Sequence, residues 1–260
     1  MSDSKVILIT SCKGGVGKST VAANLAMSLA KRGKKTLLCD CDLSNRSLDL
    51  ILGCEDDVLY DICDVVKGRC ELSRAVITDT RCGLLSFLAG PSFYEDKMES
   101  NEFADMVKAA REEYEYILID TPGSVGEAIK LAATDADMAL IVASHQPTSQ
   151  RAAEKTDMTL FELGVEERLL VINSFDYDAV LDGKRPGIID IIDKTRVRVI
   201  GVVPYSRPLA ISQEDGLLSC ERKKLDTTVA FDNIAGRILG ESIPLLNGVL
   251  KRGRRKMILA

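Results

Sequence analysis

A glycine-rich stretch near the start of the chain restricts its fold more than any other feature. Residues 10–20 read Thr-Ser-Cys-Lys-Gly-Gly-Val-Gly-Lys-Ser-Thr, directly after the apolar run of residues 6–9 and before a helical pattern. In such a strand–loop–helix unit, the glycines let successive backbone N–H groups point at one anion, and the helix adds its positive dipole end. The stretch therefore predicts a phosphate-binding loop.

Two side chains at the end of this loop would complete a nucleotide site. Lys18 would reach the β- and γ-phosphates, and the Ser19 hydroxyl would bind Mg²⁺. The loop departs from the usual G-x-x-x-x-G-K-[ST] pattern, because Cys12 occupies its first position and Lys13 supplies a second lysine. The loop residues that we expect to contact the nucleotide are Gly14, Gly15, Val16, Gly17, Lys18, Ser19 and Thr20.

The rest of the chain alternates apolar runs of strand length with helical patterns. The expected strands cover residues 6–10, 36–40, 84–89, 116–120, 138–144, 169–173 and 199–203. The expected helices cover residues 18–32, 59–66, 101–113, 125–133, 148–163 and 227–239. This alternation is typical of a twisted parallel sheet with helices on both faces, the α/β fold of P-loop NTPases. We expect one domain over residues 1–242 and a basic tail over residues 243–260.

Length and composition narrow the possible classes of protein. The 260 residues are 46% hydrophobic, which suits one large α/β domain. A formal net charge of −5 gives no general attraction to nucleic acid, so a DNA partner is not expected. The chain shows neither a signal segment nor an apolar run near the roughly 18 residues of a membrane span, which indicates a cytoplasmic protein. The eight cysteines lack C-x-x-C spacing, so we expect reduced thiols.

Acidic residues follow two of the expected strands. Asp40 and Asp42 lie at the end of the second strand, and Asp120 ends the strand at residues 116–120. Because ligands of an open α/β sheet bind at the carboxyl ends of its strands, these carboxylates should face the phosphates. We expect Asp42 to orient the attacking water, Asp40 to position the metal shell and Asp120 to hold Mg²⁺ through water. The alternative is that the acidic residues merely begin loops.

Two loops beside these carboxylates are candidate switch segments. They cover residues 42–49 and 121–127. Loops of this kind are ordered by a γ-phosphate and relax when it is lost. The switch residues that we expect in and beside them are Asp42, Asp120, Thr121, Pro122 and Gly123.

Asn173 is a candidate reader of the nucleotide base. It ends the strand at residues 169–173, and its amide offers both a donor and an acceptor. The N-K-x-D pattern of guanine readers is absent, because Ser174 and Phe175 follow, and this favours adenine. The alternative is that Asn173 only shapes a turn. His145, the only histidine, follows another strand, and we expect it to be a solvated loop residue.

These motifs together resemble those of the ParA/MinD family of deviant Walker A ATPases, which are SIMIBI-type P-loop proteins. The resemblance covers nearly the whole chain, and the septum site-determining members of the family are the most similar. The matching stretches are residues 12–20, 40–49, 60–70, 120–122, 199–204 and 248–252. The resemblance implies Mg²⁺-dependent hydrolysis of ATP, a role in placing the site of cell division, and a place for Pro204 beside Asn173 at the nucleotide.

The resemblance also implies an ATP-dependent homodimer. Lys13 would cross to the phosphates of the partner subunit, so the catalytic residues would be Lys13, Lys18 and Asp42. A cation supplied in this way makes hydrolysis depend on assembly. An activating or cargo protein is a further implied partner. The chain departs from the family where a glycine and an asparagine of the switch segment are replaced by Ser44 and Ser47, and where Ser174 replaces an arginine.

The C-terminal tail is predicted to form a basic amphipathic helix over residues 245–257. At about 100° per residue its apolar side chains share one arc, and the basic ones fall mostly outside it. The tail residues on which this rests are Leu245, Leu246, Val249, Leu250, Lys251 and Arg252. Such a helix would bind an anionic surface reversibly, at the inner face of the cell membrane. A disordered tail or a nucleic-acid contact is the alternative.

Other functions compete with septum placement. A ParA-like partitioning ATPase would position DNA or another cargo, and residues 222–224 could form a small basic patch for it. An iron–sulfur carrier of the same superfamily is disfavoured, because residues 120–130 contain no cysteine. An adaptor that binds ATP without hydrolysing it would release no phosphate.

Overall fold

The computed structural model describes residues 4–42, 46–91, 98–123, 126–222, 225–250 and 258. Within them, one sheet of eight strands has the order β3-β4-β2-β5-β1-β6-β7-β8. All neighbouring strands are parallel except β3 and β4, which form an antiparallel pair at the edge. The predicted α/β fold with a largely parallel sheet is therefore confirmed.

The strands and helices have the following bounds. The strands are β1 Lys5–Thr10, β2 Thr36–Asp40, β3 Ile77–Thr78, β4 Leu85–Leu88, β5 Tyr116–Asp120, β6 Met138–Ala143, β7 Glu167–Phe175 and β8 Val199–Pro204. The longer helices are α1 Lys18–Lys31, α5 Ser100–Glu113, α6 Glu127–Ala133, α7 Pro147–Glu162, α9 Ile188–Thr195, α10 Arg207–Glu214 and α11 Asp226–Ile238. The short ones are α2 Leu48–Leu52, α3 Ile62–Val66, α4 Leu72–Ala75, α8 Tyr177–Leu181 and the 3₁₀ turns η1 Glu55–Asp57 and η2 Ser219–Glu221.

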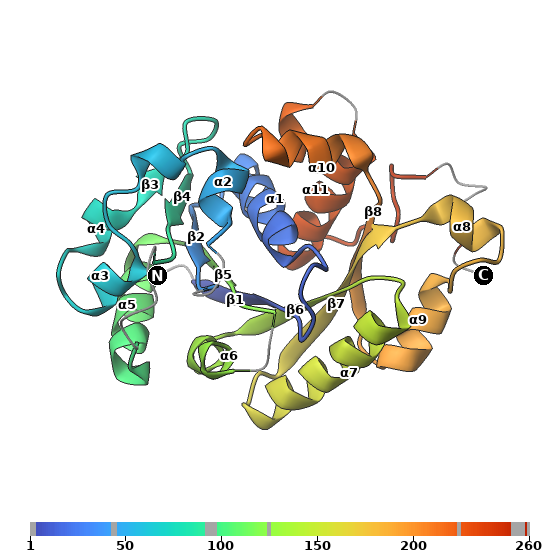
Figure 1. Ribbon diagram of the computed structural model, residues 1–260, viewed down its shortest axis with the longest axis horizontal. Coiled ribbons are helices and arrows are strands. Elements are labelled where there is room, and N and C mark those ends of the chain that lie inside the picture. Colours follow the sequence, from blue (N-terminus) through green and yellow to red (C-terminus); the bar gives the residue numbers. More distant parts are fainter. Residues whose placement is uncertain are drawn as a thin grey trace.

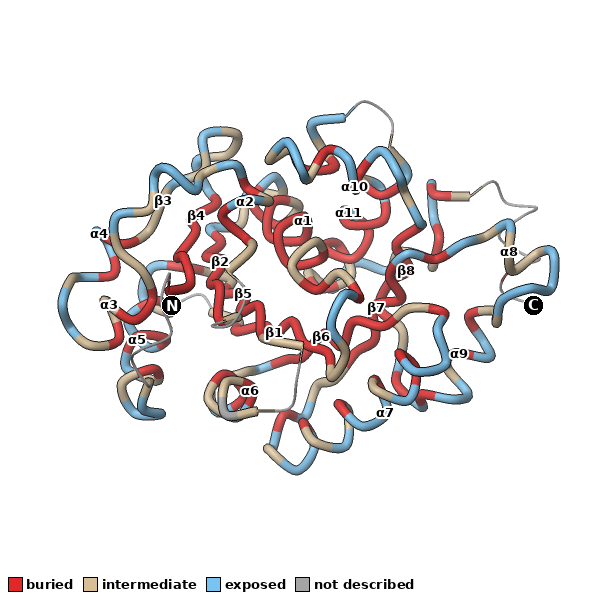
Figure 2. The backbone as a smooth tube through the Cα atoms, viewed as in Figure 1, coloured by how far each residue is buried: buried red, intermediate tan, exposed pale blue. Residues whose placement is uncertain are grey.

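Each face of the sheet packs against a separate hydrophobic core. In β1, Val6 and Leu8 point into the core shared with α5, α6 and α7, while Ile7 and Ile9 point into the core shared with α1 and α11. Figure 1 shows these two groups of helices on opposite sides of the sheet. Because both faces are covered, most residues of the central strands are buried (Figure 2), and their sequences are largely continuous apolar runs.

The seven predicted strands are all present, with ends that shift by up to two residues. The helix predicted over residues 59–66 is shorter, because α3 begins only at Ile62. Asp61 caps it: its carboxylate accepts hydrogen bonds from the backbone N–H groups of Cys63 at 2.8 Å and Asp64 at 3.2 Å. Leu59, assigned to this helix, is 84% exposed.

The segment after α11 differs from the predicted tail. Residues 245–249 form turns rather than a helix, and Leu246 and Val249 are 2% and 6% exposed, each packed into one of the two cores. The Arg237 guanidinium donates hydrogen bonds to the carbonyls of Ile243 and Pro244, at 2.9 and 2.8 Å. Residues 243–249 therefore pack against the rest of the described chain, and the domain boundary after residue 242 stays a prediction.

The remaining tail residues are only partly described. Lys251, Arg252 and the other residues up to 257 lie outside the described residues, whereas Ile258 is buried in the same core as Leu246. Within the described ranges, none of the helices combines the length and apolar character needed to cross a membrane.

Candidate functional site

The phosphate loop joins β1 to α1 with a backbone that requires glycine. Gly15 and Gly17 have φ angles of 74° and 86°, in the left-handed region that side chains disfavour. A Cβ on Gly17 would also lie 2.3 Å from Nδ2 of Asn173. Gly17 is the N-cap of α1 and has no side chain to cap it, so the first N–H groups of the helix stay available for an anion.

Lys18 and Asp120 are the buried members of the site, and the half-buried Ser19 lies near them. Lys18 is 7% exposed at the start of α1, and Asp120 is fully buried at the end of β5. Burial raises the pKa of Asp120 to about 8, while the nearby Ser19 hydroxyl and Lys18 ammonium partly oppose that rise. No described donor completes a hydrogen bond to either Asp120 oxygen.

Two unpartnered carboxylate oxygens in a buried position fit a hydrated cation. Mg²⁺ usually binds through one or two carboxylates or hydroxyls, with waters and phosphates completing its shell. No cluster of three or more acidic, histidine or cysteine ligands exists in the described part of the chain. The buried, unpartnered oxygens of Asp120 beside Ser19 are compatible with such a metal, and the assignment of these two residues as its ligands stays a prediction.

Asp40 serves as an anchor for the first switch segment. Its carboxylate accepts hydrogen bonds from the backbone N–H groups of Asp42 at 3.0 Å, Ser47 at 3.3 Å and Leu48 at 3.2 Å. Burial raises the pKa of Asp40 to about 6, although these N–H groups oppose the rise. The three contacts hold Asp42, Ser47 and Leu48 at the end of β2, so Asp40 already has a structural role. The part predicted for it in the metal shell stays a prediction.

The same anchored segment touches the phosphate loop. The Ser47 hydroxyl lies 3.2 Å from the Ser19 hydroxyl, the predicted metal ligand. Asp42 is half-buried. It adjoins residues 43–45, which include Ser44 and lie outside the described residues. The structure thus places Asp42 close to the site, and its role with water stays a prediction.

The second switch segment packs directly on the phosphate loop. The N–H and hydroxyl groups of Thr121 both donate to the carbonyl of Ile9, at 3.2 and 3.1 Å. A Cβ on Gly123 would lie only 2.9 Å from Cα of Gly14, so the two backbones are in contact. Pro122 lies between Thr121 and Gly123, and residues 124–125 lie outside the described residues.

Asn173 braces the phosphate loop. Its amide nitrogen donates a 2.8 Å hydrogen bond to the carbonyl of Val16, and the side chain is 5% exposed. The amide donor predicted for a base is therefore already used within the protein. Pro204 is buried at the end of β8, where it pairs with Phe175 of β7. Contacts of Asn173 and Pro204 with adenine stay predictions.

His145 is not the solvated loop residue that we expected. It is 4% exposed and stacks on Phe175, with 4.4 Å between ring centroids. Its Nε2 accepts a 2.8 Å hydrogen bond from the Asp176 N–H, and its Nδ1 lies 3.2 Å from the carbonyl of Pro186. Burial lowers its pKa, so the neutral ring joins the ends of β6 and β7 to the loop before α9.

Several residues that contact the phosphate loop were missed in the sequence. Lys13 Nζ donates to Oε1 of Gln146 and to Oγ1 of Thr148, and the Cys12 N–H donates to Oγ1 of Thr156 at 3.0 Å. These three partners come from α7 and its N-cap. A threonine or glutamine at a helix start has many ordinary roles, so no sequence signal identifies them.

The chain matches known proteins along nearly its whole length. A family model described as an AAA domain matches residues 4–161. The septum site-determining protein MinD of Helicobacter pylori is 35% identical over 95% of each chain. MinD of Bacillus subtilis is 33% identical over 93% of this chain and 91% of its own.

Solved structures agree with these matches. In the MinC:MinD cell division protein complex of Aquifex aeolicus, a chain with 33% identity superposes with a TM-score of 0.88 over 96% of this chain and 99% of its own. The Pyrococcus horikoshii MinD complexed with Mg-ADP is 24% identical over 92% of this chain and all of its own, and its TM-score of 0.81 shows the same fold. Together with the geometry of the phosphate loop, matches of this extent show that the chain belongs to the MinD/ParA family of ATPases and is MinD-like.

Proposed function

We propose that this ATPase is a switch that forms a homodimer when it binds ATP and that helps to place the division septum. The observation that carries the proposal is the pair of lysines on one loop. Lys18 is buried beside Asp120, whereas Lys13 is partly exposed next to the exposed Gly14 and Gly15. A buried lysine suits the nucleotide of its own subunit, and a surface lysine suits a second subunit.

The residues divide the work as follows. Lys18 and the loop N–H groups would hold the phosphates, and Asp120 and Ser19 would hold Mg²⁺, which would supply positive charge to the phosphate oxygens. Asp42 orients the attacking water and takes up its proton. Lys13 of one subunit stabilises charge on the phosphates of the other, so hydrolysis requires the dimer.

Three variants test this function. Lys18→Ala should lose tight ATP binding in calorimetry.

Asp42→Ala should bind ATP and accumulate as a dimer but should hydrolyse ATP at least about tenfold more slowly, a loss of roughly 1.4 kcal/mol of transition-state stabilisation or more. Lys13→Ala should bind ATP yet stay monomeric by light scattering. An ATP-dependent Lys13→Ala dimer, or parent-like hydrolysis by Asp42→Ala, would contradict the proposal.

We further propose reversible binding to an anionic membrane through the residues after 250. Support comes from the basic residues of this segment, because Lys251 is followed by Arg252, Arg254, Arg255 and Lys256. Because Leu246 and Val249 are buried, the membrane contact would rest on the later part of the tail. Two tails on one ATP dimer would bind much more strongly than one. A MinC-like protein is the partner that we propose from the Aquifex complex.

The membrane proposal is tested by sedimentation with anionic liposomes in ATP and in ADP. Deleting residues 251–260 should abolish ATP-dependent sedimentation but retain ATP binding. Because the deletion also removes the buried Ile258, the Ile258→Ala variant is the control for lost packing and should still sediment. Sedimentation of the truncated protein would place the anchor elsewhere.

A further inference from the structure

Two consecutive residues of the phosphate loop are bound to α7. Lys13 Nζ donates to Gln146 Oε1 and, at 2.8 Å, to Thr148 Oγ1, while the Cys12 N–H donates to Thr156 Oγ1 at 3.0 Å. In Figure 1 the dark-blue loop after β1 runs between α1 and α7. The Lys13 ammonium, which in our proposed function contacts the phosphates of the other subunit, is thus held here on its own subunit.

The electrostatics of this contact are unfavourable for a cation. Both acceptors are uncharged, and they lie at the N-cap and in the first turn of α7. That end of a helix carries about half a positive charge, and the first turn of α7 contains no acidic residue to offset it. Phosphate oxygens would therefore compete well for the ammonium, because they carry the negative charge that both present acceptors lack.

The acceptors nevertheless sit on a rigid support. The Ser144 N–H donates to Ser149 Oγ at 2.9 Å, and Gln150 Nε2 donates to the carbonyl of His145 at 2.9 Å. His145 is itself buried and joined to two other segments. The start of α7, which carries the acceptors for Lys13, is thus held by hydrogen bonds of its own.

We propose that Gln146 and Thr148 are positioning residues that hold Lys13 in a resting site, and that Lys13 leaves this site when two ATP-bound subunits join. The release step rests on the proposed ATP dimer. A resting contact that exists only in the monomer shifts the equilibrium away from the dimer. Removing the contact should therefore favour dimer formation, provided that ATP is bound.

The resting site is tested first without nucleotide. A brief pulse of an amine-acylating reagent, read by peptide mass spectrometry, reports the reactivity of Lys13. In a Gln146→Leu, Thr148→Val double variant Lys13 should react about three- to tenfold faster than in the parent. Gln146 caps no N–H group of α7 with its side chain, so the helix start should persist. Thr148→Ser retains a hydroxyl and should keep the parent rate, as should Thr159→Val, whose hydroxyl bonds only within α7. An unchanged Lys13 rate in the double variant would overturn the resting site.

The release step is tested by light scattering in ATP. The double variant should dimerise at a protein concentration several-fold below that of the parent, whereas Thr148→Ser and Thr159→Val should match the parent. If Lys13 becomes more reactive but the dimer is no stronger, release is not part of dimer formation, and that half of the proposal fails. If the parent forms no ATP dimer at all, the proposed function and the release step both fail, while the acylation result still decides the resting site.

Discussion

At the scale of single residues, the site concentrates charge where water is excluded. Burial raises the pKa of Asp120 to about 8 and that of Asp40 to about 6. A raised folded-state pKa means that the folded protein binds protons more readily than the unfolded chain. The stability that comes from protonation is complete below the unfolded pKa near 4 and is lost as pH rises through the folded pKa. Without nucleotide and metal, the fold should be weaker at pH 8 than at pH 5.

The Asp120→Asn variant should separate the loss of stability caused by the buried charge from the function of Asp120. At pH 8 the nucleotide-free variant should be more stable than the parent by about 1–2 kcal/mol, because an amide avoids burying a charge. The gain should shrink toward pH 5, where Asp120 of the parent is protonated. Urea unfolding at several pH values measures this difference in stability between the variant and the parent. Asp182→Asn, at an exposed ion pair with Lys184, is the control. A variant that is less stable than the parent at pH 8 would contradict the buried charge.

The same substitution should also remove stabilisation by Mg²⁺ and ATP. The parent should gain thermal stability when the two are added together, whereas Asp120→Asn should gain clearly less. Equal gains in both proteins would remove Asp120 from the metal site. A site that is costly when empty and useful when filled is common where function requires buried charge.

At the scale of elements, the phosphate loop is held by parts of the chain that are far from it in sequence. Asn173 of β7 holds Val16, Thr156 of α7 holds Cys12, and the Thr20 hydroxyl donates to Gln213 of α10 at 3.0 Å. The glycine pattern predicted the loop because its backbone angles depend on local sequence. The braces could not be predicted, since each joins residues more than 140 positions apart.

The helices and strands likewise divide into those that the sequence predicts and those that it does not. The central strands were predictable because a strand buried on both faces must be a continuous apolar run. The missed helices α2, α4, α8, α9 and α10 have only four to eight residues, too few to show a helical period. The edge strand β3 has two residues. Residues 245–249 were wrongly predicted to be helical, because an apolar arc does not reveal whether it faces lipid or the protein's own core.

The contact between the second switch segment and the phosphate loop gives a prediction at this scale. Gly123→Ala would place a Cβ 2.9 Å from Cα and 3.0 Å from N of Gly14. Backbone atoms cannot rotate away, so the loop must deform. We expect about tenfold weaker ATP binding and a stability loss of about 1–3 kcal/mol. Calorimetry and urea unfolding measure the two effects.

Gly126→Ala is the matched control for this prediction. Gly126 lies three residues further along the same connection, and a Cβ there would meet nothing within 4 Å. It should bind ATP as the parent does. Equal ATP affinity of the two variants would show that the contact at Gly14 does not shape the nucleotide site.

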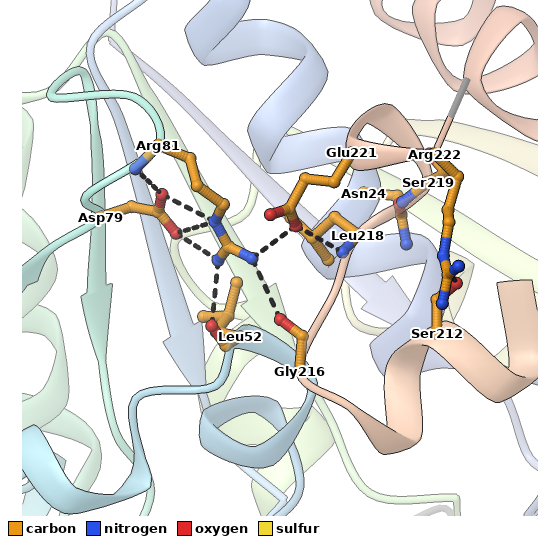
Figure 3. A network of polar contacts seen from close by, with 10 residues as sticks. All are labelled: Asn24, Leu52, Asp79, Arg81, Ser212, Gly216, Leu218, Ser219, Glu221 and Arg222. Atoms are coloured by element: carbon orange, nitrogen blue, oxygen red, sulfur yellow. Dashed lines mark hydrogen bonds and ion pairs between the residues drawn. The ribbon is translucent and has the colours of Figure 1, made fainter. Parts of the chain in front are cut away.

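At the scale of the whole molecule, Arg81 joins segments that follow different parts of the site. Its guanidinium donates to the carbonyls of Leu52 at 3.0 Å and Gly216 at 3.1 Å, and it pairs with Asp79 and Glu221 (Figure 3). Leu52 ends α2, which begins within the first switch segment. Gly216 follows α10, which holds Thr20 through Gln213. The network thus links the first switch segment, through α2 and α10, to Thr20 at the start of α1.

Removing the Arg81 side chain should loosen this link. Arg81→Ala leaves the carboxylate of Asp79, whose side chain is 6% exposed, without its cation, and we expect a loss of about 3–5 kcal/mol in the free energy of unfolding. The free energy of unfolding of Arg81→Lys should lie between those of Arg81→Ala and the parent, because one ammonium cannot reproduce the several hydrogen bonds of the planar guanidinium. The control is Arg198→Ala, which removes an exposed pair with Glu167 at 3.6 Å and should change stability by less than about 0.5 kcal/mol.

Hydrogen exchange distinguishes a local link from a general loss of stability. Under native conditions the amides of α2 and of residues 216–221 should exchange faster in Arg81→Ala, because both lose the guanidinium that joins them. The amides of β6 and β7, on the other side of β1, should change only as far as global stability does. If α2 and residues 216–221 exchanged no faster than β6 and β7, Arg81 would be a general stabilising residue, and the first switch segment would have no connection to α10 through it.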